Sequence, residues 1–169
     1  MQTRRLLVTI MALILLGVGL VAAEADAATP AVGMCHESGT VILTPGLTAS
    51  PQKVTLTFTG TVSPCLTSGP SILSGTESGS GNFTGSCASG TGSTVYTVVW
   101  DNGKKTSATF TFNTLGPTAV GMNKYIHGEF AGGEAPGYVV FTPTDPSACT
   151  SPGGASEVTF DGWFGVGGS

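Results

Sequence analysis

Apolar and polar positions alternate along most of the chain after position 38. The clearest stretch, 53–63, sets apolar side chains against threonines: Val54, Leu56, Phe58 and Val62 against Thr55, Thr57, Thr59 and Thr61. A period of two places successive side chains on opposite faces of a β-strand. This stretch is therefore predicted to be a strand with one buried face and one outward face lined by hydroxyl groups.

Eight segments carry a strand pattern and are bounded by glycine, proline and serine. They span residues 39–43, 53–63, 71–85, 94–100, 106–112, 124–130, 138–141 and 157–164. No helix longer than a turn is indicated. Seven or eight short strands in about 140 residues predict an antiparallel β-sandwich, immunoglobulin-like or related, as one domain over 28–169.

The strongest hairpin signal is the sequence Asp101-Asn102-Gly103. Asn-Gly is the preferred pair of a two-residue type I′ turn, because both positions require a positive φ. A two-residue turn at Asn102-Gly103 pairs Trp100 with Lys105 and Tyr96 with Thr109 across the hairpin. It predicts two faces for the hairpin, a core face of Val95, Val99, Ala108, Phe110 and Phe112 and an outward face of Tyr96, Val98 and Trp100.

Segment 157–164 repeats this alternation. Val158, Phe160 and Phe164 share one face, and Trp163 falls on the other. Outward aromatic side chains suit sugar rings or a partner surface. Tyr96, Trp100 and Trp163 are therefore the predicted binding residues, with a covering loop, sheet edge or dimer partner as the alternative reason for their position.

The N-terminus has the layout of an export signal. Arg4 and Arg5 precede an apolar run over 6–23, interrupted only by Thr9, which is followed by Ala25-Asp26-Ala27. This order predicts a secretory signal peptide over 1–27 and a mature extracellular chain that begins near Ala28. A retained anchor is the alternative, because about 18 apolar residues can just span a bilayer. After cleavage no membrane association is expected.

The four cysteines, Cys35, Cys65, Cys87 and Cys149, all follow the export signal. An even number in an exported chain predicts two disulfides. Consecutive antiparallel strands alternate their ends between two poles, which places Cys35 with Cys65 and Cys87 with Cys149. A disulfide needs Cα atoms within about 7 Å, so these two pairings are predicted.

The charge and the histidine content of the chain argue against two classes of function, nucleic-acid binding and zinc binding. The chain has 10 acidic and 6 basic residues, and its arginines lie only at positions 4 and 5, so a nucleic-acid partner is not expected. Two histidines are too few for a zinc site with three or four ligands, and no cofactor is expected. Tyr125, His127 and Glu129 alternate on one strand face, and a His–carboxylate pair can orient a general base.

The segments GTVILTPG (39–46), TGTVSPC (59–65), GSC (85–87) and WDNG (100–103) resemble small secreted proteins of high-GC Gram-positive bacteria. The resemblance implies a secreted β-sandwich and no particular activity. We therefore expect a secreted, non-enzymatic protein with a binding or cell-envelope role and a cell-wall glycan or a protein as partner. The alternatives are a small-molecule carrier with an apolar pocket and a small hydrolase that uses Tyr125, His127 and Glu129.

Overall fold

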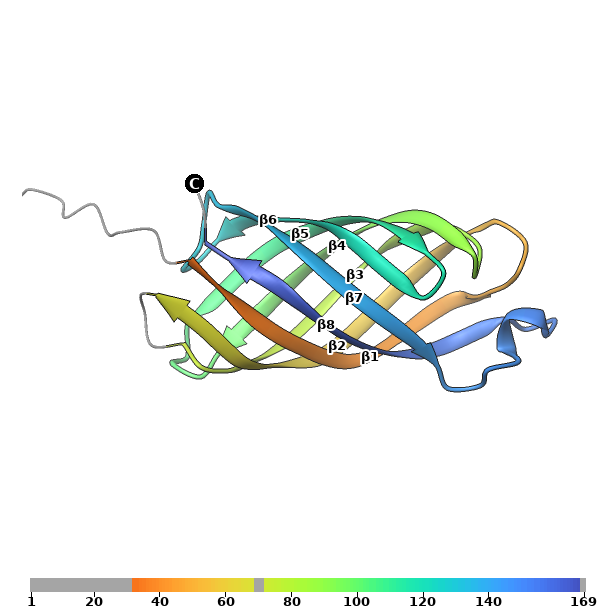
Figure 1. Ribbon diagram of the computed structural model, residues 1–169, viewed down its shortest axis with the longest axis horizontal. Helices are drawn as coiled ribbons and strands as arrows, with labels where there is room; N and C mark the ends of the chain where they lie inside the picture. Colours follow the sequence, from red (N-terminus) through yellow and green to blue (C-terminus); the bar gives the residue numbers. More distant parts are fainter. Residues whose placement is uncertain (1–31, 69–71, 168–169) are drawn as a thin grey trace, which may run out of the picture.

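Eight strands form the whole framework of the protein in the computed structural model, which describes residues 32–68 and 72–167 (Figure 1). The strands are β1 Val32–Leu47, β2 Gln52–Ser68, β3 Gly75–Gly85, β4 Ser89–Trp100, β5 Lys105–Leu115, β6 Thr118–His127, β7 Glu134–Pro143 and β8 Ala155–Val166. One short 3-10 helix, η1, spans Ala148–Thr150. The predicted signal peptide, 1–27, lies outside the described residues.

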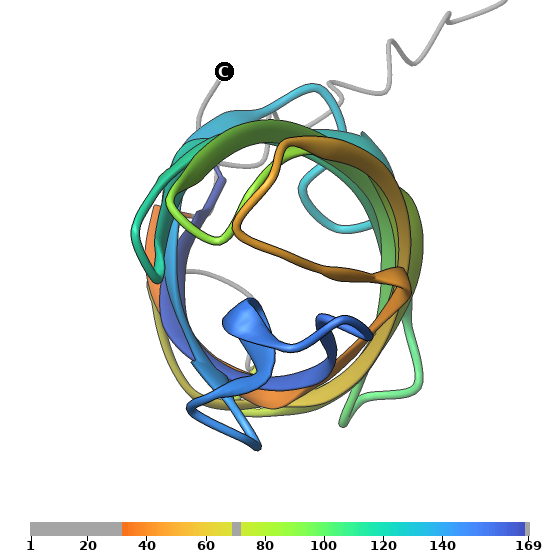
Figure 2. The ribbon, with the colours of Figure 1, turned by 90° about the vertical axis from the view of Figure 1, so that its right-hand side faces the viewer.

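Each strand pairs antiparallel with the next one, and β1 also pairs antiparallel with β8. The sheet is thereby a closed eight-stranded barrel, seen end-on in Figure 2. The all-β prediction is confirmed, and the predicted sandwich is wrong. Both architectures need strands with one inward and one outward face, so alternation alone does not distinguish them.

The hairpin between β4 and β5 has a different register from the predicted one. The Trp100 amide donates to the Lys104 carbonyl oxygen at 2.9 Å, which makes a three-residue loop, and Gly103 alone in it has a positive φ. Tyr96 consequently pairs with Ala108 instead of Thr109. A shift of one residue exchanges the two faces of a strand.

The predicted faces of β4 are therefore wrong. Tyr96, Val98 and Trp100 point into the barrel, whereas Val95 and Val99 lie outside. The predicted faces of 157–164 are correct: Val158, Phe160 and Phe164 are buried, and Trp163 points outward. The predicted strand 124–130 is also misplaced, because β6 begins at Thr118 and ends at His127.

Both predicted disulfides are present, Cys35–Cys65 with a Cα–Cα distance of 4.1 Å and Cys87–Cys149 with one of 6.1 Å. Cys35 pairs with Cys65 and Glu37 with Val62, so β2 has one extra residue at Ser63-Pro64. This bulge lets Val62 and Cys65, three residues apart, both face the interior. Proline fits there because it has no amide hydrogen to donate.

The barrel interior has two unlike halves. The closed half, at the end with the β4–β5 and β6–β7 turns, is filled by large side chains that include Trp100, Tyr125, Phe130 and Phe164. The open half, at the end with the β1–β2, β3–β4, β5–β6 and β7–β8 connections, contains a second apolar cluster. Some of these connections extend across part of the barrel end that faces the viewer in Figure 2.

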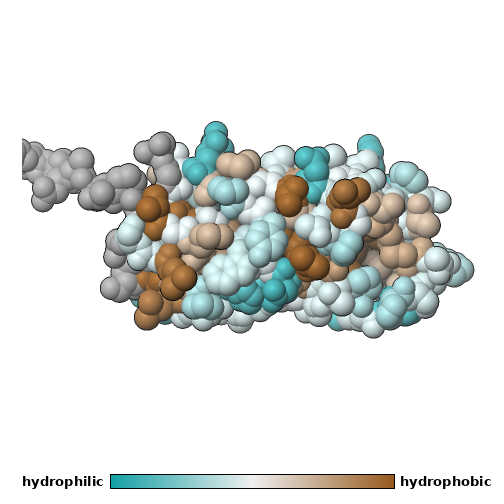
Figure 3. Space-filling view, viewed as in Figure 1, coloured by the Kyte–Doolittle hydropathy of each residue, from teal (hydrophilic) through white to brown (hydrophobic). Residues whose placement is uncertain are grey.

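The face shown in Figure 3 is mostly pale or hydrophilic, with separate apolar patches. The four threonines of 53–63 point outward and are exposed, as predicted. Among the described residues, no helix is long and apolar enough to cross a membrane.

Gly39 allows close contact between β1, β2 and the Phe160 ring. A Cβ atom at this position would lie 2.2 Å from the Thr59 carbonyl oxygen and 2.7 Å from the Phe160 ring. We expect Gly39→Ala to lower the free energy of unfolding by about 1–3 kcal/mol, because the extra atom overpacks the interior. Urea unfolding followed by tryptophan fluorescence measures the change. The control is Gly153→Ala, whose added Cβ meets nothing within 4 Å; equal stability of the two variants would contradict the close packing.

Candidate functional site

A cavity of about 270 Å³ occupies the open half of the barrel, and all eight strands contribute to its wall. Six of the eight phenylalanines in the protein line it: Phe58, Phe83, Phe110, Phe112, Phe141 and Phe160. Aliphatic side chains complete the wall: Val41, Leu43, Leu47, Leu56, Val139 and Val158. The volume is just below the usual range of about 300–1,000 Å³ for small-molecule sites.

The phenylalanine rings lie along the wall, over inward-facing glycines. A Cβ atom at Gly79 would lie 2.6 Å from the Phe58 ring, and one at Gly92 would lie 2.4 Å from the Phe112 ring. The Phe110 and Phe112 rings stack with centroids 5.2 Å apart. Because glycine leaves room beside the strand for a ring, these side chains cover the wall and leave space along the barrel axis.

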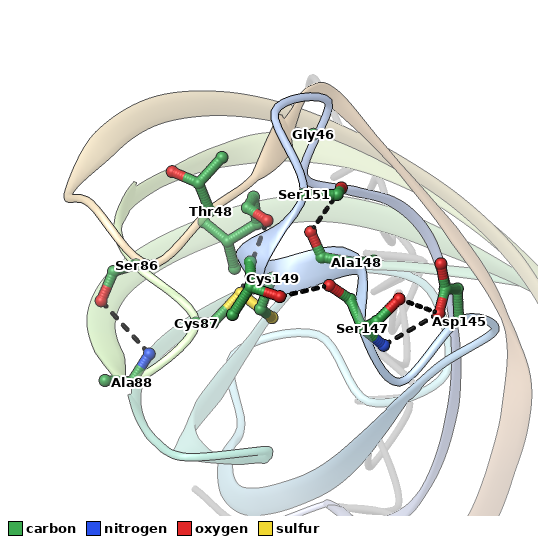
Figure 4. Close-up of a disulfide and its surroundings, with 12 residues drawn as sticks. Gly46, Thr48, Ser86, Cys87, Ala88, Asp145, Ser147, Ala148, Cys149 and Ser151 are labelled. Carbon is green, nitrogen blue, oxygen red and sulfur yellow. Dashed lines mark hydrogen bonds between the residues drawn. A yellow bond between two sulfur atoms is a disulfide. The ribbon is translucent and has the colours of Figure 1, made fainter.

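The cavity opens among the connections at its end of the barrel, which Figure 4 shows around Cys87 and Cys149. This disulfide joins the β3–β4 turn to η1. The Cys87 amide donates to the Thr48 carbonyl oxygen at 2.9 Å, and the Ala49 amide donates to the Cys149 carbonyl oxygen at 3.0 Å. The disulfide and these bonds hold three of the four connections together at the mouth.

A short cap positions Cys149. The Asp145 carboxylate accepts hydrogen bonds from both the amide and the hydroxyl of Ser147, each at 2.8 Å, immediately before η1. An aspartate that accepts from the backbone two residues ahead stabilises a turn of this kind. The mouth of the cavity is therefore built from ordered connections.

The floor of the cavity is polar, in contrast to its wall. Glu77 is only 3 % exposed, and its carboxyl group has no hydrogen-bond partner among the described residues other than the carboxyl group of Glu37. Glu37, on β1, lines the same floor and interacts electrostatically with Glu77. Gly60 on β2 separates the two strands, and a Cβ atom there would lie 2.9 Å from Glu77 Oε1. The missing side chain leaves room for the Glu77 carboxyl group and the Phe160 ring.

Two further polar side chains complete the floor. The Tyr96 hydroxyl donates to Asn123 Oδ1 at 2.8 Å, in the interior. Asn123 Nδ2 is buried and has no hydrogen-bond partner in the described part of the chain. The floor thus presents two carboxyl groups, which hydrogen-bond only to each other among the described residues, and one unpaired amide donor to the cavity.

Burial, together with the nearby Glu37 carboxyl group, raises the pKa of Glu77 to about 9. Burial likewise raises the pKa of Glu37, to about 7, although its hydrogen bond with Glu77 and the nearby His36 act in the opposite direction. Glu37 in turn raises the pKa of the Tyr96 and Tyr125 hydroxyls inside the barrel. The two carboxyl groups therefore retain protons at neutral pH that exposed glutamates would have lost.

No protein-family model, curated protein or solved structure matches this chain. Its function is therefore argued from the cavity and from the residues around it.

The three predicted binding residues do not share a surface. Trp100 is 2 % exposed in the closed half, where its indole N–H donates to Thr106 Oγ1 at 2.8 Å. Tyr96 lines the cavity, so its predicted outward position is wrong although a binding role stays a prediction. Trp163 is half-buried on the outside and packs edge-on against His36 with centroids 5.1 Å apart.

Tyr125, His127 and Glu129 are not brought together. The Tyr125 hydroxyl donates to the Gly165 carbonyl oxygen inside the barrel. His127 is exposed at the end of β6, and Glu129 lies in the following turn, 2.6 Å from the Lys104 ammonium group. In the part of the chain that the structure describes, no three potential metal-ligating side chains gather.

Sequence reasoning missed the floor residues Glu37, Glu77 and Asn123. A signal for Glu37 is present, because it shares the period of two with Cys35, Val41 and Leu43 and must face inward with them. Segment 71–85 has too few apolar residues to show which way Glu77 points. A glutamate that shares the two-residue period of the buried apolar residues is the feature that would identify a polar cavity floor.

The buried carboxyl pair makes stability depend on pH. An unfolded glutamate loses its proton near pH 4.5, whereas folded Glu77 keeps it to about pH 9, so the stabilisation present below pH 4.5 is lost as the pH rises toward 9. Glutamine stays neutral at every pH. We therefore expect the free energy of unfolding of Glu77→Gln to fall by a few kcal/mol less than that of wild type as the pH rises from 5 to 9. Urea unfolding at pH 5, 7 and 9 measures it.

The matched control for this prediction is Glu157→Gln, which removes one carboxylate from the exposed face of β8. It should keep the wild-type pH dependence. If Glu77→Gln also kept the wild-type slope, the buried carboxyl group would not be the source of the effect.

Proposed function

We propose that the protein is a secreted, non-catalytic carrier that binds one small apolar ligand in the open half of its barrel. The observation that supports this proposal most is the phenylalanine-lined cavity, which is open to solvent at one end. Eight-stranded barrels have interiors that side chains can fill or that can hold one small ligand. This barrel combines both arrangements.

Packing supports a ligand in the open half. Protein interiors are close-packed, with few voids larger than a water molecule. The closed half follows this rule, with Trp100, Tyr125 and Phe130 in mutual edge-on or tilted contact. The open half has a cavity of about 270 Å³ instead. An apolar ligand would recover dispersion contacts there and would remove apolar surface from water, at about 25 cal/mol per Å².

The distribution of polar groups favours binding over catalysis. The four polar side chains Glu37, Glu77, Tyr96 and Asn123 lie at the floor, while the wall is mostly aliphatic and aromatic, with hydroxyl groups at Ser86, Thr94 and Thr114. Small-molecule sites typically have this form, an apolar pocket with a few polar groups that orient the ligand. Secretion is the part of the proposal that rests on the predicted signal peptide. The two disulfides fit folding in an oxidising compartment.

A variant that obstructs the mouth tests the carrier function. Thr114 on β5 lines the cavity near its mouth, so Thr114→Trp should weaken binding of the neutral apolar dye N-phenyl-1-naphthylamine by about tenfold or more. The neighbouring residue Leu115 points outward and is 81 % exposed, so Leu115→Trp adds the same ring on the opposite face and should bind like wild type. Titration followed by dye fluorescence measures both.

Equal dye affinity of the Thr114→Trp variant and wild type would place the dye outside the cavity. Absence of saturable binding to folded wild-type protein would also contradict the proposal.

A further inference from the structure

We infer that the ligand carries a protonated amine, which binds at the carboxyl groups of Glu37 and Glu77 on the cavity floor. This inference rests on the proposed carrier function and names the chemical class of its ligand. An amphiphilic amine, with an ammonium head and an apolar body, fits the two regions of the cavity.

The lack of a cationic partner for Glu77 is the first argument. A carboxylate removed from water is strongly destabilising unless a partner compensates it. Glu77 is 3 % exposed, and among the described residues its carboxyl group has only the Glu37 carboxyl group as a hydrogen-bond partner. Two lysines pair with carboxylates elsewhere, Lys104 with Glu129 and Lys124 with Glu134. An ammonium group that enters the cavity would pair with the carboxylate and let Glu77 release its proton.

The surroundings of the carboxyl groups are the second argument. Glu37 and Glu77 lie on β1 and β3, and residue 60 of the intervening β2 is glycine, paired with both Gly39 and Glu77. The Phe160 ring lies over both glycines, 2.7 Å and 2.8 Å from where their Cβ atoms would be, and Glu37, Glu77 and Phe160 all line the cavity. A primary ammonium group has three N–H donors, which suits a site with several acceptor oxygens.

The aromatic rings next to the floor are the third argument. Phe58 packs against Tyr96 with centroids 6.3 Å apart and perpendicular to Phe160 with centroids 5.9 Å apart. Aromatic faces attract organic cations, and the same rings accept an apolar body. An anionic head group would have no cationic partner at Glu37 and Glu77 and is disfavoured.

Three probes with the same alkyl chain distinguish the head groups: octylamine, octan-1-ol and octanoate. We expect calorimetric titration of the full mature protein at pH 7 to show octylamine binding at least about tenfold tighter than octan-1-ol, with octanoate weakest. Tenfold corresponds to the lower range for a hydrogen bond to a charged group.

Variants of the two glutamates locate the amine. Glu77→Gln and Glu37→Gln keep the shape of the side chain but cannot release a proton to form an anion beside the ammonium group, so the preference for octylamine over octan-1-ol should fall toward one while octan-1-ol binding persists. Glu157→Gln, on the outer face, should keep the wild-type preference. If a glutamine variant does not fold, the three-probe comparison on wild-type protein decides the inference by itself.

Equal affinity of wild-type protein for octylamine and octan-1-ol overturns the inference and leaves the carrier function standing. An octylamine preference that survives in both glutamine variants also overturns it, because the amine would then bind elsewhere. If none of the three probes and no neutral dye binds, the carrier function fails and the inference fails with it.

Discussion

Hydrogen bonding between β1 and β8 closes the sheet, and closure determines what the interior can contain. Ten consecutive residue pairs, from Gly33 with Val166 to Ile42 with Glu157, join the first strand to the last. An eight-stranded closed sheet has an interior of limited width. Large side chains such as Trp100 and Tyr125 fill one half of that width. In the other half, phenylalanine rings lie over inward-facing glycines and leave a cavity.

Much of this framework could be predicted from local patterns. The faces of 53–63 and 157–164 followed from alternation, and both disulfides followed from the antiparallel order of neighbouring strands, which a barrel and a sandwich share. Closure could not be predicted in this way, because pairing of β1 with β8 joins segments more than 100 residues apart and leaves no local signal. The predicted face of β4 is wrong because the loop after Trp100 has three residues and not two, which shifts the pairing of β4 with β5 by one residue.

The candidate site was less accessible from the sequence than the fold. In the sequence, each phenylalanine of the cavity has the pattern of an ordinary core residue. Alternation shows which side chains point inward, but it does not show whether they fill the interior. Glu77 lies in a glycine-rich strand without an apolar pattern. Its significance emerges only when closure brings β1, β2 and β3 around one floor, where Gly60 leaves two carboxyl groups without an intervening side chain.

The position of a bound neutral ligand shows whether the open half of the barrel is a binding cavity. In a titration of isotope-labelled protein with octan-1-ol, nuclear magnetic resonance of the methyl groups reports on each half separately. Binding in the open half should give saturable shifts for Val41 and Val158 and much smaller ones for Val62 and Val98 in the closed half. Shifts confined to outward residues such as Val120, which is 54 % exposed, would contradict it.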